Sequence, residues 1–191
     1  MQYAEMVVLL VGSSWLVYAP TRRAEGDRGS ESRNRGSLQV SARADYALRA
    51  AAELARAAAG GTGPLKGEAI SESQRIPKKF MENILHDLKR SGIVRTQRGA
   101  SGGYWLALPA EEISLADVIR AVEGPLANIR GEWPEDVEYS GAAKPLREVW
   151  IAVRASLRAV LESVTLADLV NSELPAPIPE LLRNPEAWVH H

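Results

Sequence analysis

The residues best suited to read nucleic-acid bases lie in one predicted helix, which covers residues 77–90. Three of its polar side chains could each pair with a different base edge in the major groove of DNA. Asn83 can form two hydrogen bonds with adenine, Glu82 can accept from the amino group of cytosine, and Lys79 can donate to guanine. Each such pairing discriminates between bases by roughly 1–3 kcal/mol. Any amphipathic surface helix also carries a charged outer face, so a plain solvated face is the alternative interpretation.

A glycine-rich loop with an arginine at its edge follows this helix. The short apolar segments 93–98 and 104–108 predict two strands, and residues 99–103 (Gly-Ala-Ser-Gly-Gly) favour a tight tip between them, because glycine permits positive φ. A thin loop that carries Arg98 could enter the narrow minor groove, where negative potential is concentrated. The alternative is a hairpin without a ligand.

Other side chains could contact the phosphate backbone. Ser41 and Arg43 stand at the start of a predicted alanine-rich helix, 41–59, where free backbone N–H groups favour a phosphate. The alternative is a plain core helix. The remaining candidates for phosphate contacts are basic residues of the predicted helix 77–90: Lys78, Lys89 and Arg90.

The order of elements around these residues is that of a winged helix-turn-helix. A short helix, 66–73, and a turn, 74–76, precede the helix 77–90, which should end before Gly92. The apolar face of that helix is predicted to consist of Phe80, Ile84, Leu85 and Leu88. The predicted fold class is therefore mainly α-helical with a small β-hairpin wing, followed by a long helix.

That long helix, predicted for residues 145–164, carries an apolar seam. The seam consists of Leu146, Trp150, Val153, Leu157, Val160 and Val164. Their alternating spacing of four and three residues is typical of a helix that pairs with another helix. We expect pairing between two copies of the chain, with packing against its own domain as the alternative.

Composition narrows the function classes. The net charge of the 191-residue chain is −1, yet residues 38–109 carry a net charge of +5 and residues 110–191 a net charge of −7. A basic module joined to an acidic one suits a protein that presents one face to phosphates. The chain has no cysteine, which excludes disulfides, Cys-ligated zinc and ordinary iron–sulfur clusters. No metal-ligand cluster, phosphate loop or nucleophile–base pair occurs, so neither a cofactor nor an enzymatic activity is expected.

The segments outside the predicted DNA-binding unit, 38–124, are less informative. Residues 1–37 combine an apolar run, 6–19, that is too short to cross a bilayer with a stretch, 21–37, whose composition predicts disorder. We favour an upstream extension from a misplaced start; a membrane anchor and an ordered arm stay open.

The C-terminal half is predicted in three further parts. Residues 125–144 form a connecting loop, with a partner or ligand site as the alternative. Residues 145–170 contain the dimerisation helix and a short helix whose cap, Thr165 with Asp168, repeats an earlier one, Ser114 with Asp117. Residues 171–191 form a proline-rich tail, in which residues 173–187 are predicted to be disordered or to become ordered on contact.

Residues 38–170 resemble the Rrf2 family of bacterial transcription regulators. The motifs that carry the resemblance are SARADYALRA, IPKKFMENILHDLKRSGIV, RGASGGY, ISLADVIRAVEGPL and VTLADLV. The resemblance implies a homodimer in which each winged domain is joined to a long crossing helix. It also implies that Lys79, Glu82 and Asn83 read bases, that Arg98 enters the minor groove, and that Ser41 and Arg43 touch phosphates.

The chain departs from the family in one respect. Many members carry three cysteines between the fourth helix and the dimerisation helix, and these bind an iron–sulfur cluster. The corresponding stretch here, 124–144, has none. The chain is more similar to a cysteine-poor branch, in which one regulator of cysteine metabolism responds through a partner enzyme.

The sequence thus predicts a sequence-specific DNA-binding transcription regulator, in particular a repressor, that acts as a homodimer on a pseudo-palindromic operator. Its expected partners are double-stranded DNA, a second copy of the chain, and a protein or small-molecule effector. We expect it in the cytoplasm, without a membrane partner and without a cofactor. The alternative is a protein-interaction module that docks on a metabolic enzyme through the winged domain or the loop 124–144.

Overall fold

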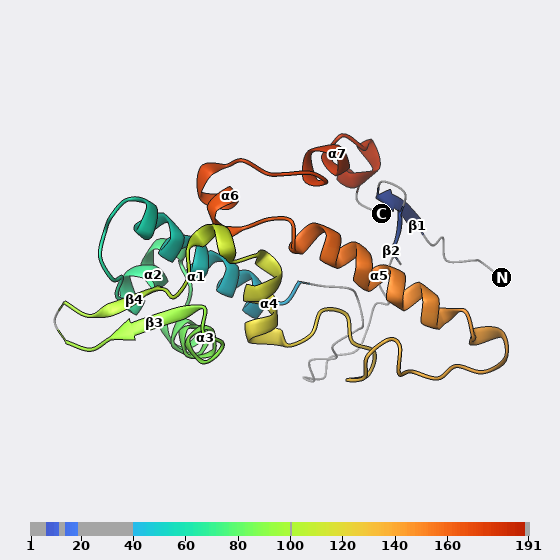
Figure 1. Cartoon of the computed structure of the whole chain (residues 1–191), viewed down its shortest axis with the longest axis horizontal. Coiled ribbons are helices and arrows are strands. Elements are labelled where there is room, and N and C mark those ends of the chain that lie inside the picture. The colour runs from blue at the N-terminus through green and yellow to red at the C-terminus, as the bar shows by residue number, and fades with distance from the viewer. Residues whose placement is uncertain (1–6, 12–13, 19–39, 100, 190–191) are drawn as a thin grey trace, which may run out of the picture.

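The computed structural model of this chain describes residues 7–11, 14–18, 40–99 and 101–189 (Figure 1). Its strands are β1 (Val7–Val11), β2 (Ser14–Tyr18), β3 (Val94–Gln97) and β4 (Gly103–Leu106). Its α-helices are α1 (Ala42–Ala59), α2 (Gly67–Gln74), α3 (Lys78–Arg90), α4 (Leu115–Glu123), α5 (Leu146–Leu161), α6 (Leu166–Asn171) and α7 (Ile178–Leu182). Short 3₁₀ turns are η1 (Ala110–Glu112), η2 (Gly141–Ala143) and η3 (Pro185–Trp188). This is the mainly α-helical fold with a hairpin wing that the sequence predicts.

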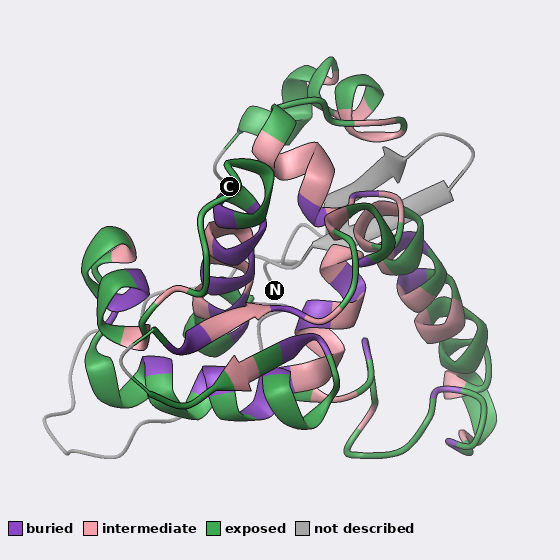
Figure 2. Cartoon of the chain, turned by 60° about the vertical axis from the view of Figure 1, so that its left-hand side comes forward, coloured by how far each residue is buried: buried purple, intermediate pink, exposed green. Residues whose placement is uncertain are grey.

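Helix α1 is the centre of the winged domain. It begins where the sequence predicts, because the Ser41 hydroxyl accepts a hydrogen bond from the backbone N–H of Ala44 at 3.0 Å. Helices α2, α3, α4 and α6 and strand β4 all contact it. Its inner face is lined by Ala47, Ala50 and Ala51, which are fully buried. Alanine lets neighbouring helix backbones approach closely, so one helix can support several elements at once. Figure 2 shows the buried positions along this helix.

Helices α4 and α6 are joined at their N-termini. Both begin with the predicted capping boxes, in which Ser114 pairs with Asp117 and Thr165 pairs with Asp168. Hydrogen bonds from the Thr165 backbone N–H and hydroxyl lower the pKa of Asp168. Between the two caps, the N–H of Leu115 donates to the carbonyl of Val164 at 2.9 Å. This pairing fixes the point at which α5 leaves the domain.

Strands β3 and β4 form the predicted antiparallel wing, with Val94 opposite Leu106 and Gln97 opposite Gly103. Leu65 extends the ladder, because it exchanges two backbone hydrogen bonds with Tyr104, at 2.8 and 2.9 Å. The sequence predicts positive φ at the loop glycines. Among Gly99, Gly102 and Gly103, only Gly99 has a positive φ, of 108°. At Gly102 and Gly103 a Cβ atom would collide with neighbouring backbone, so these positions require the absence of a side chain.

Three predictions are corrected. Phe80 does not belong to the buried face of α3: it is 54% exposed, and Met81 is buried in its place, because Met81 lies three and four residues before the buried Ile84 and Leu85. Helix α5 ends at Leu161, so Val164 is not part of its seam but packs, buried, beside α4. The proline-rich tail contains α7 and η3.

At the N-terminus, β1 and β2 pair as an antiparallel hairpin, and β2 lies beside α5. The disorder predicted for residues 21–37 concerns a stretch outside the described residues. Among the residues that the structure describes, no helix has the length and apolar character needed to cross a membrane.

The close approach of Leu65 to the wing generates a stability prediction. An alanine Cβ at position 103 would lie 2.5 Å from the carbonyl oxygen of Leu65. We therefore expect Gly103→Ala to lower the free energy of unfolding by roughly 1–3 kcal/mol, as overpacked substitutions do. Urea denaturation at a fixed chain concentration, followed by circular dichroism, measures it. Gly63→Ala is the control, because no atom lies within 4 Å of its Cβ. Equal losses in both variants would contradict this packing argument.

Candidate DNA-binding face

Helix α3 presents its polar side chains to solvent. Met81, Ile84, Leu85 and Leu88 face the core and are buried. The exposed side chains are Lys78, Lys79, Glu82, Asn83, His86, Lys89 and Arg90. Within the described part of the chain, the side chains of Lys79, Glu82 and Asn83 make no hydrogen bond or ion pair. The three predicted base-reading groups are therefore exposed and available to a ligand.

The turn before α3 is held by polar contacts from α1. Arg49 donates to the side-chain oxygen of Gln74 at 3.1 Å and also to its backbone carbonyl, and Gln74 donates to Glu53 at 2.5 Å. Burial acts to raise the pKa of Glu53, but hydrogen bonds from Arg56 and Gln74 outweigh it, and the pKa is lowered. Arg75 closes α2 in the left-handed conformation, with φ of 54°. These contacts set the angle at which α3 leaves the turn.

A buried carboxylate joins α3 to the start of α1. Asp87 is only 7% exposed, and it forms ion pairs with Arg43 from α1 and, at 3.5 Å, with Arg90 one turn along its own helix. The sequence assigns both arginines to phosphates and does not identify their shared partner. The sequence pattern could have identified Asp87 as this partner, because Asp87 lies three residues after Ile84 and therefore borders the apolar face of α3. Each arginine remains partly exposed, so a phosphate could still approach, but neither charge is free.

The N-terminus of α1 already faces a carboxylate. The Ser41 hydroxyl donates to Glu123, the last residue of α4, at 2.7 Å while it accepts from Ala44. A negative side chain beside free helix N–H groups is electrostatically favourable. A phosphate at this position would compete with Glu123. The predicted contact from Ser41 to DNA thus has a rival within the chain.

The wing lies beside α3 and carries Arg98 at the start of its tip (Figure 1). Arg98 is exposed, and no described residue forms an ion pair with it. Lys66, at the start of α2, donates to the carbonyl of Gly99 at 3.0 Å and anchors the tip. A groove of about 320 Å³ between the start of α2 and the tip end of the wing is lined by both basic residues. The sequence patterns did not single out Lys66, which adds positive charge beside Arg98.

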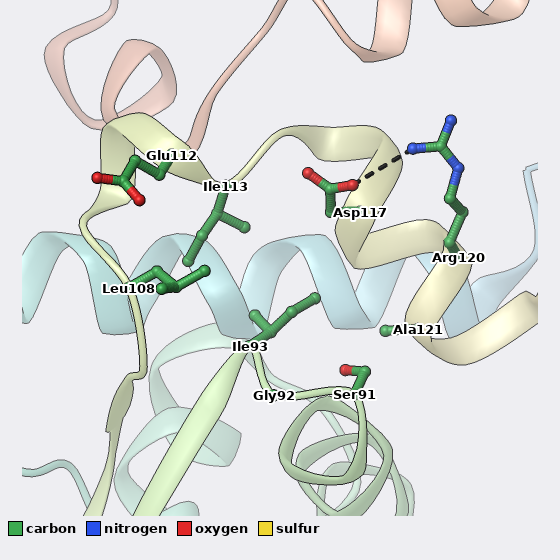
Figure 3. Close-up of a pocket in the computed structure, with 9 residues that line it drawn as sticks. All are labelled: Ser91, Gly92, Ile93, Leu108, Glu112, Ile113, Asp117, Arg120 and Ala121. Carbon is green, nitrogen blue, oxygen red and sulfur yellow. Dashed lines mark hydrogen bonds and ion pairs between the residues drawn. The ribbon is translucent and has the colours of Figure 1, made fainter.

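A second pocket, of about 340 Å³, lies between the base of the wing, the end of α3 and α4 (Figure 3). Ile93, Ile113 and Leu108 form its apolar wall. Arg120 at its rim pairs with Asp117 at 3.3 Å and with Glu162. Because its basic group is already paired, this pocket offers no free positive charge to a ligand.

The apolar seam of α5 is only partly covered within one chain. Val153 is buried, Trp150, Leu157 and Val160 are half-buried, and Leu146 is exposed. Val149, beside this row, is 38% exposed. The five remaining seam residues share one face of the helix, as their spacing predicts.

The loop 125–144 is fastened to α5 by side chains. Arg154 pairs with Glu135 at 2.6 Å, and its guanidinium lies 5.9 Å from the ring centroid of Trp133. The hydrogen bond from Arg154 lowers the pKa of Glu135. Pro134 and Val137 are buried beside this contact. We call the interaction among Arg154, Glu135 and Trp133 the loop clasp.

Residues of this loop do not fit a thiolate-bound iron site. The whole chain lacks cysteine, and among the described residues no three His, Asp or Glu side chains gather closely enough to hold a metal ion. The loop clasp occupies the segment instead.

Comparison with known proteins supports the same architecture. Residues 40–172 match the model of the Rrf2 family, described as an iron-dependent transcriptional regulator. A putative HTH-type transcriptional regulator of Mycobacterium tuberculosis is 44% identical over 144 residues, which cover 75% of this chain and 88% of that protein. The HTH-type transcriptional regulator CymR of Bacillus subtilis is 33% identical over 134 residues, covering 70% and 91% of the two chains.

Solved structures agree. CymR, the global cysteine regulator of B. subtilis, superposes with a TM-score of 0.59 at 32% identity, over 71% of this chain and 98% of that one. IscR of T. potens gives a TM-score of 0.58 at 29% identity, over 81% and 93% of the two chains.

The buried ion pairs generate a second stability prediction. We expect Asp87→Asn to lower the free energy of unfolding by about 1–3 kcal/mol, because it weakens charge-assisted hydrogen bonds at a buried site. The matched control is Asp45→Asn, which removes an exposed pair with Arg49 on α1 and should cost below about 1 kcal/mol. Urea denaturation of the three proteins measures both. If the two substitutions cost the same, Asp87 does not join α1 to α3 as described.

Proposed function

The chain belongs to the Rrf2 family of transcriptional regulators, and on that premise we propose that it is a repressor that binds a pseudo-palindromic operator as a homodimer. It is a DNA-binding transcription regulator and not an enzyme. The observation that carries the finer proposal is that α3 and the wing are in contact, and that each exposes polar side chains that have no partner among the described residues.

Recognition divides between the two grooves. In a helix-turn-helix protein the N-terminal part of the second helix meets base edges in the major groove. Lys79, Glu82 and Asn83 all lie in the first two turns of α3. With α3 in the major groove, the adjacent wing can reach a neighbouring minor groove and insert Arg98. Base identity would be read mainly by α3, and groove width by the wing.

Phosphate contacts would supply much of the affinity. Lys78 and Lys89 flank the base-reading residues of α3, and neither forms an ion pair within the described residues. Arg43 and Arg90 would also contact phosphates, although each guanidinium group is already paired with the carboxylate of Asp87. Each phosphate neutralised releases counterions, so binding should weaken steeply with salt.

The seam of α5 supports the proposed homodimer. A partly exposed apolar face on a helix that projects from its domain favours a partner with a matching face. Two copies related by a two-fold axis would present two α3 helices to half-sites about 10 bp apart, or a multiple of that spacing. Repression then requires only that this operator overlap a promoter.

We infer that the signal does not pass through a Cys-ligated cluster, since the chain has no thiolate to bind one. The loop clasp supports this inference, because it fixes the loop with a cation, a carboxylate and an aromatic ring. A protein or a small molecule remains the expected effector. The protein would act in the cytoplasm, where bacterial DNA lies.

The wing arginine tests the DNA-binding proposal. We expect Arg98→Ala to weaken specific operator binding by roughly 1–3 kcal/mol, because it removes the minor-groove contact. Gel-shift titration of an operator selected from random DNA measures it. The control Arg183→Ala removes an exposed arginine after α7, far along the chain from the wing, and should leave affinity unchanged. Unchanged affinity in Arg98→Ala, together with a shallow salt dependence, would favour the protein-interaction module instead.

The seam tests the homodimer. We expect Leu157→Asp to yield monomers, because it places a charge in the middle of the apolar interface. Analytical ultracentrifugation measures the mass in solution. Ala155→Asp is the matched control, since Ala155 is exposed and lies on the opposite side of the same helix. A Leu157→Asp protein that is still dimeric would rule out the seam as the interface.

A further inference from the structure

An exposed aromatic ring stands in the first turn of α3, among the residues proposed to face DNA. Phe80 is 54% exposed, although phenylalanine stabilises a fold chiefly when it is buried. All other exposed side chains of α3 are polar or charged. Phe80 therefore adds little to the core, and its position calls for a partner outside the domain.

The ring is held in place from α1. Tyr46 meets it edge to face, with ring centroids 6.1 Å apart and an interplanar angle of 73°. Tyr46 is in turn covered by the guanidinium of Arg49, 5.5 Å from its centroid, and Arg49 is bonded to the helix-turn-helix turn at Gln74. A ring fixed in this way loses little conformational entropy when it binds.

Phe80 also shares a surface groove with a predicted base-reading residue. The groove, of about 290 Å³, is lined by Phe80 and Asn83 and closed by the Arg43–Asp87 pair. A ligand that enters this groove therefore meets both Asn83 and the ring of Phe80. Basic groups on the same helix, Lys78 and Lys79, would hold the phosphates of that ligand nearby.

We propose that Phe80 recognises a thymine in each half-site by contact with its C5 methyl group. That methyl is the apolar group that base pairs present in the major groove, and apolar side chains, phenylalanine among them, are its usual partners. The inference rests on the proposed function, because it requires α3 to enter the major groove. It adds a preference that hydrogen bonding by Lys79, Glu82 and Asn83 does not supply.

Deoxyuridine substitution tests this directly, because uracil differs from thymine only by the missing methyl. In the selected operator, each thymine is replaced in turn by deoxyuridine, and the affinity of the wild-type protein is measured by gel-shift titration. We expect one thymine in each half-site at which the replacement lowers affinity about fourfold, the factor that corresponds to one buried methyl group. This arm needs no protein variant, so it does not depend on the folding of one.

The second arm assigns the contact to its residue. Phe80→Ala should bind the thymine operator about as weakly as the wild type binds the deoxyuridine operator, and should no longer distinguish the two. Leu182→Ala is the control, since Leu182 is a similarly exposed apolar residue on α7, and it should keep the full discrimination.

Two results would overturn the proposal: no thymine at which deoxyuridine weakens wild-type binding, or a loss that persists unchanged in Phe80→Ala. The selection from random DNA would separately detect a failure of the proposed function itself. In that case the wild type would select no preferred sequence from random DNA, and the inference about Phe80 would fall with it.

Discussion

The close packing of other elements against the alanine face of α1 is the constraint on which the rest of this structure depends. Ala47, Ala50 and Ala51 are fully buried, and α1 contacts α2, α3, α4, α6 and β4. Larger side chains at these positions would move those elements apart, because a close-packed core does not absorb extra volume without strain. The position of α3 relative to the wing follows from their common support on α1.

The same residues serve stability and, in our proposal, DNA binding. Asp87 pairs with Arg43 of α1 and with Arg90 of its own helix, so one of the proposed phosphate contacts, Arg43, also joins α1 to α3. A guanidinium group that binds a carboxylate and a phosphate at once interacts less strongly with each of them, but the carboxylate holds the guanidinium group in position. Ser41 is in a similar situation, since it bonds to Glu123 at the end of α4. Among the proposed DNA contacts, the basic side chains with no competing partner among the described residues are Lys78, Lys79, Lys89 and Arg98.

The segment between α4 and α5 is organised by its own side chains. The loop clasp brings Trp133 and Glu135 against Arg154, while Pro134 and Val137 are buried beneath it. A segment that is fixed by packing and an ion pair does not require a metal for its conformation.

The sequence by itself determined the α-helices and strands between residues 41 and 171, their order and most of their ends, because capping residues, glycines and helical periodicity act locally. The caps at Ser41, Ser114 and Thr165 and the exposed group Lys79, Glu82 and Asn83 were all predictable in this way. Only the tertiary structure decided which charges meet, because Arg43 and Asp87 are 44 residues apart. It also placed Phe80 outside the core and Val164 beyond the end of the seam helix. It showed in addition that Gly102 and Gly103 must lack a side chain, because neighbouring backbone occupies the space that a Cβ would need. Such outcomes depend on contacts between segments distant in the chain, which no local pattern records.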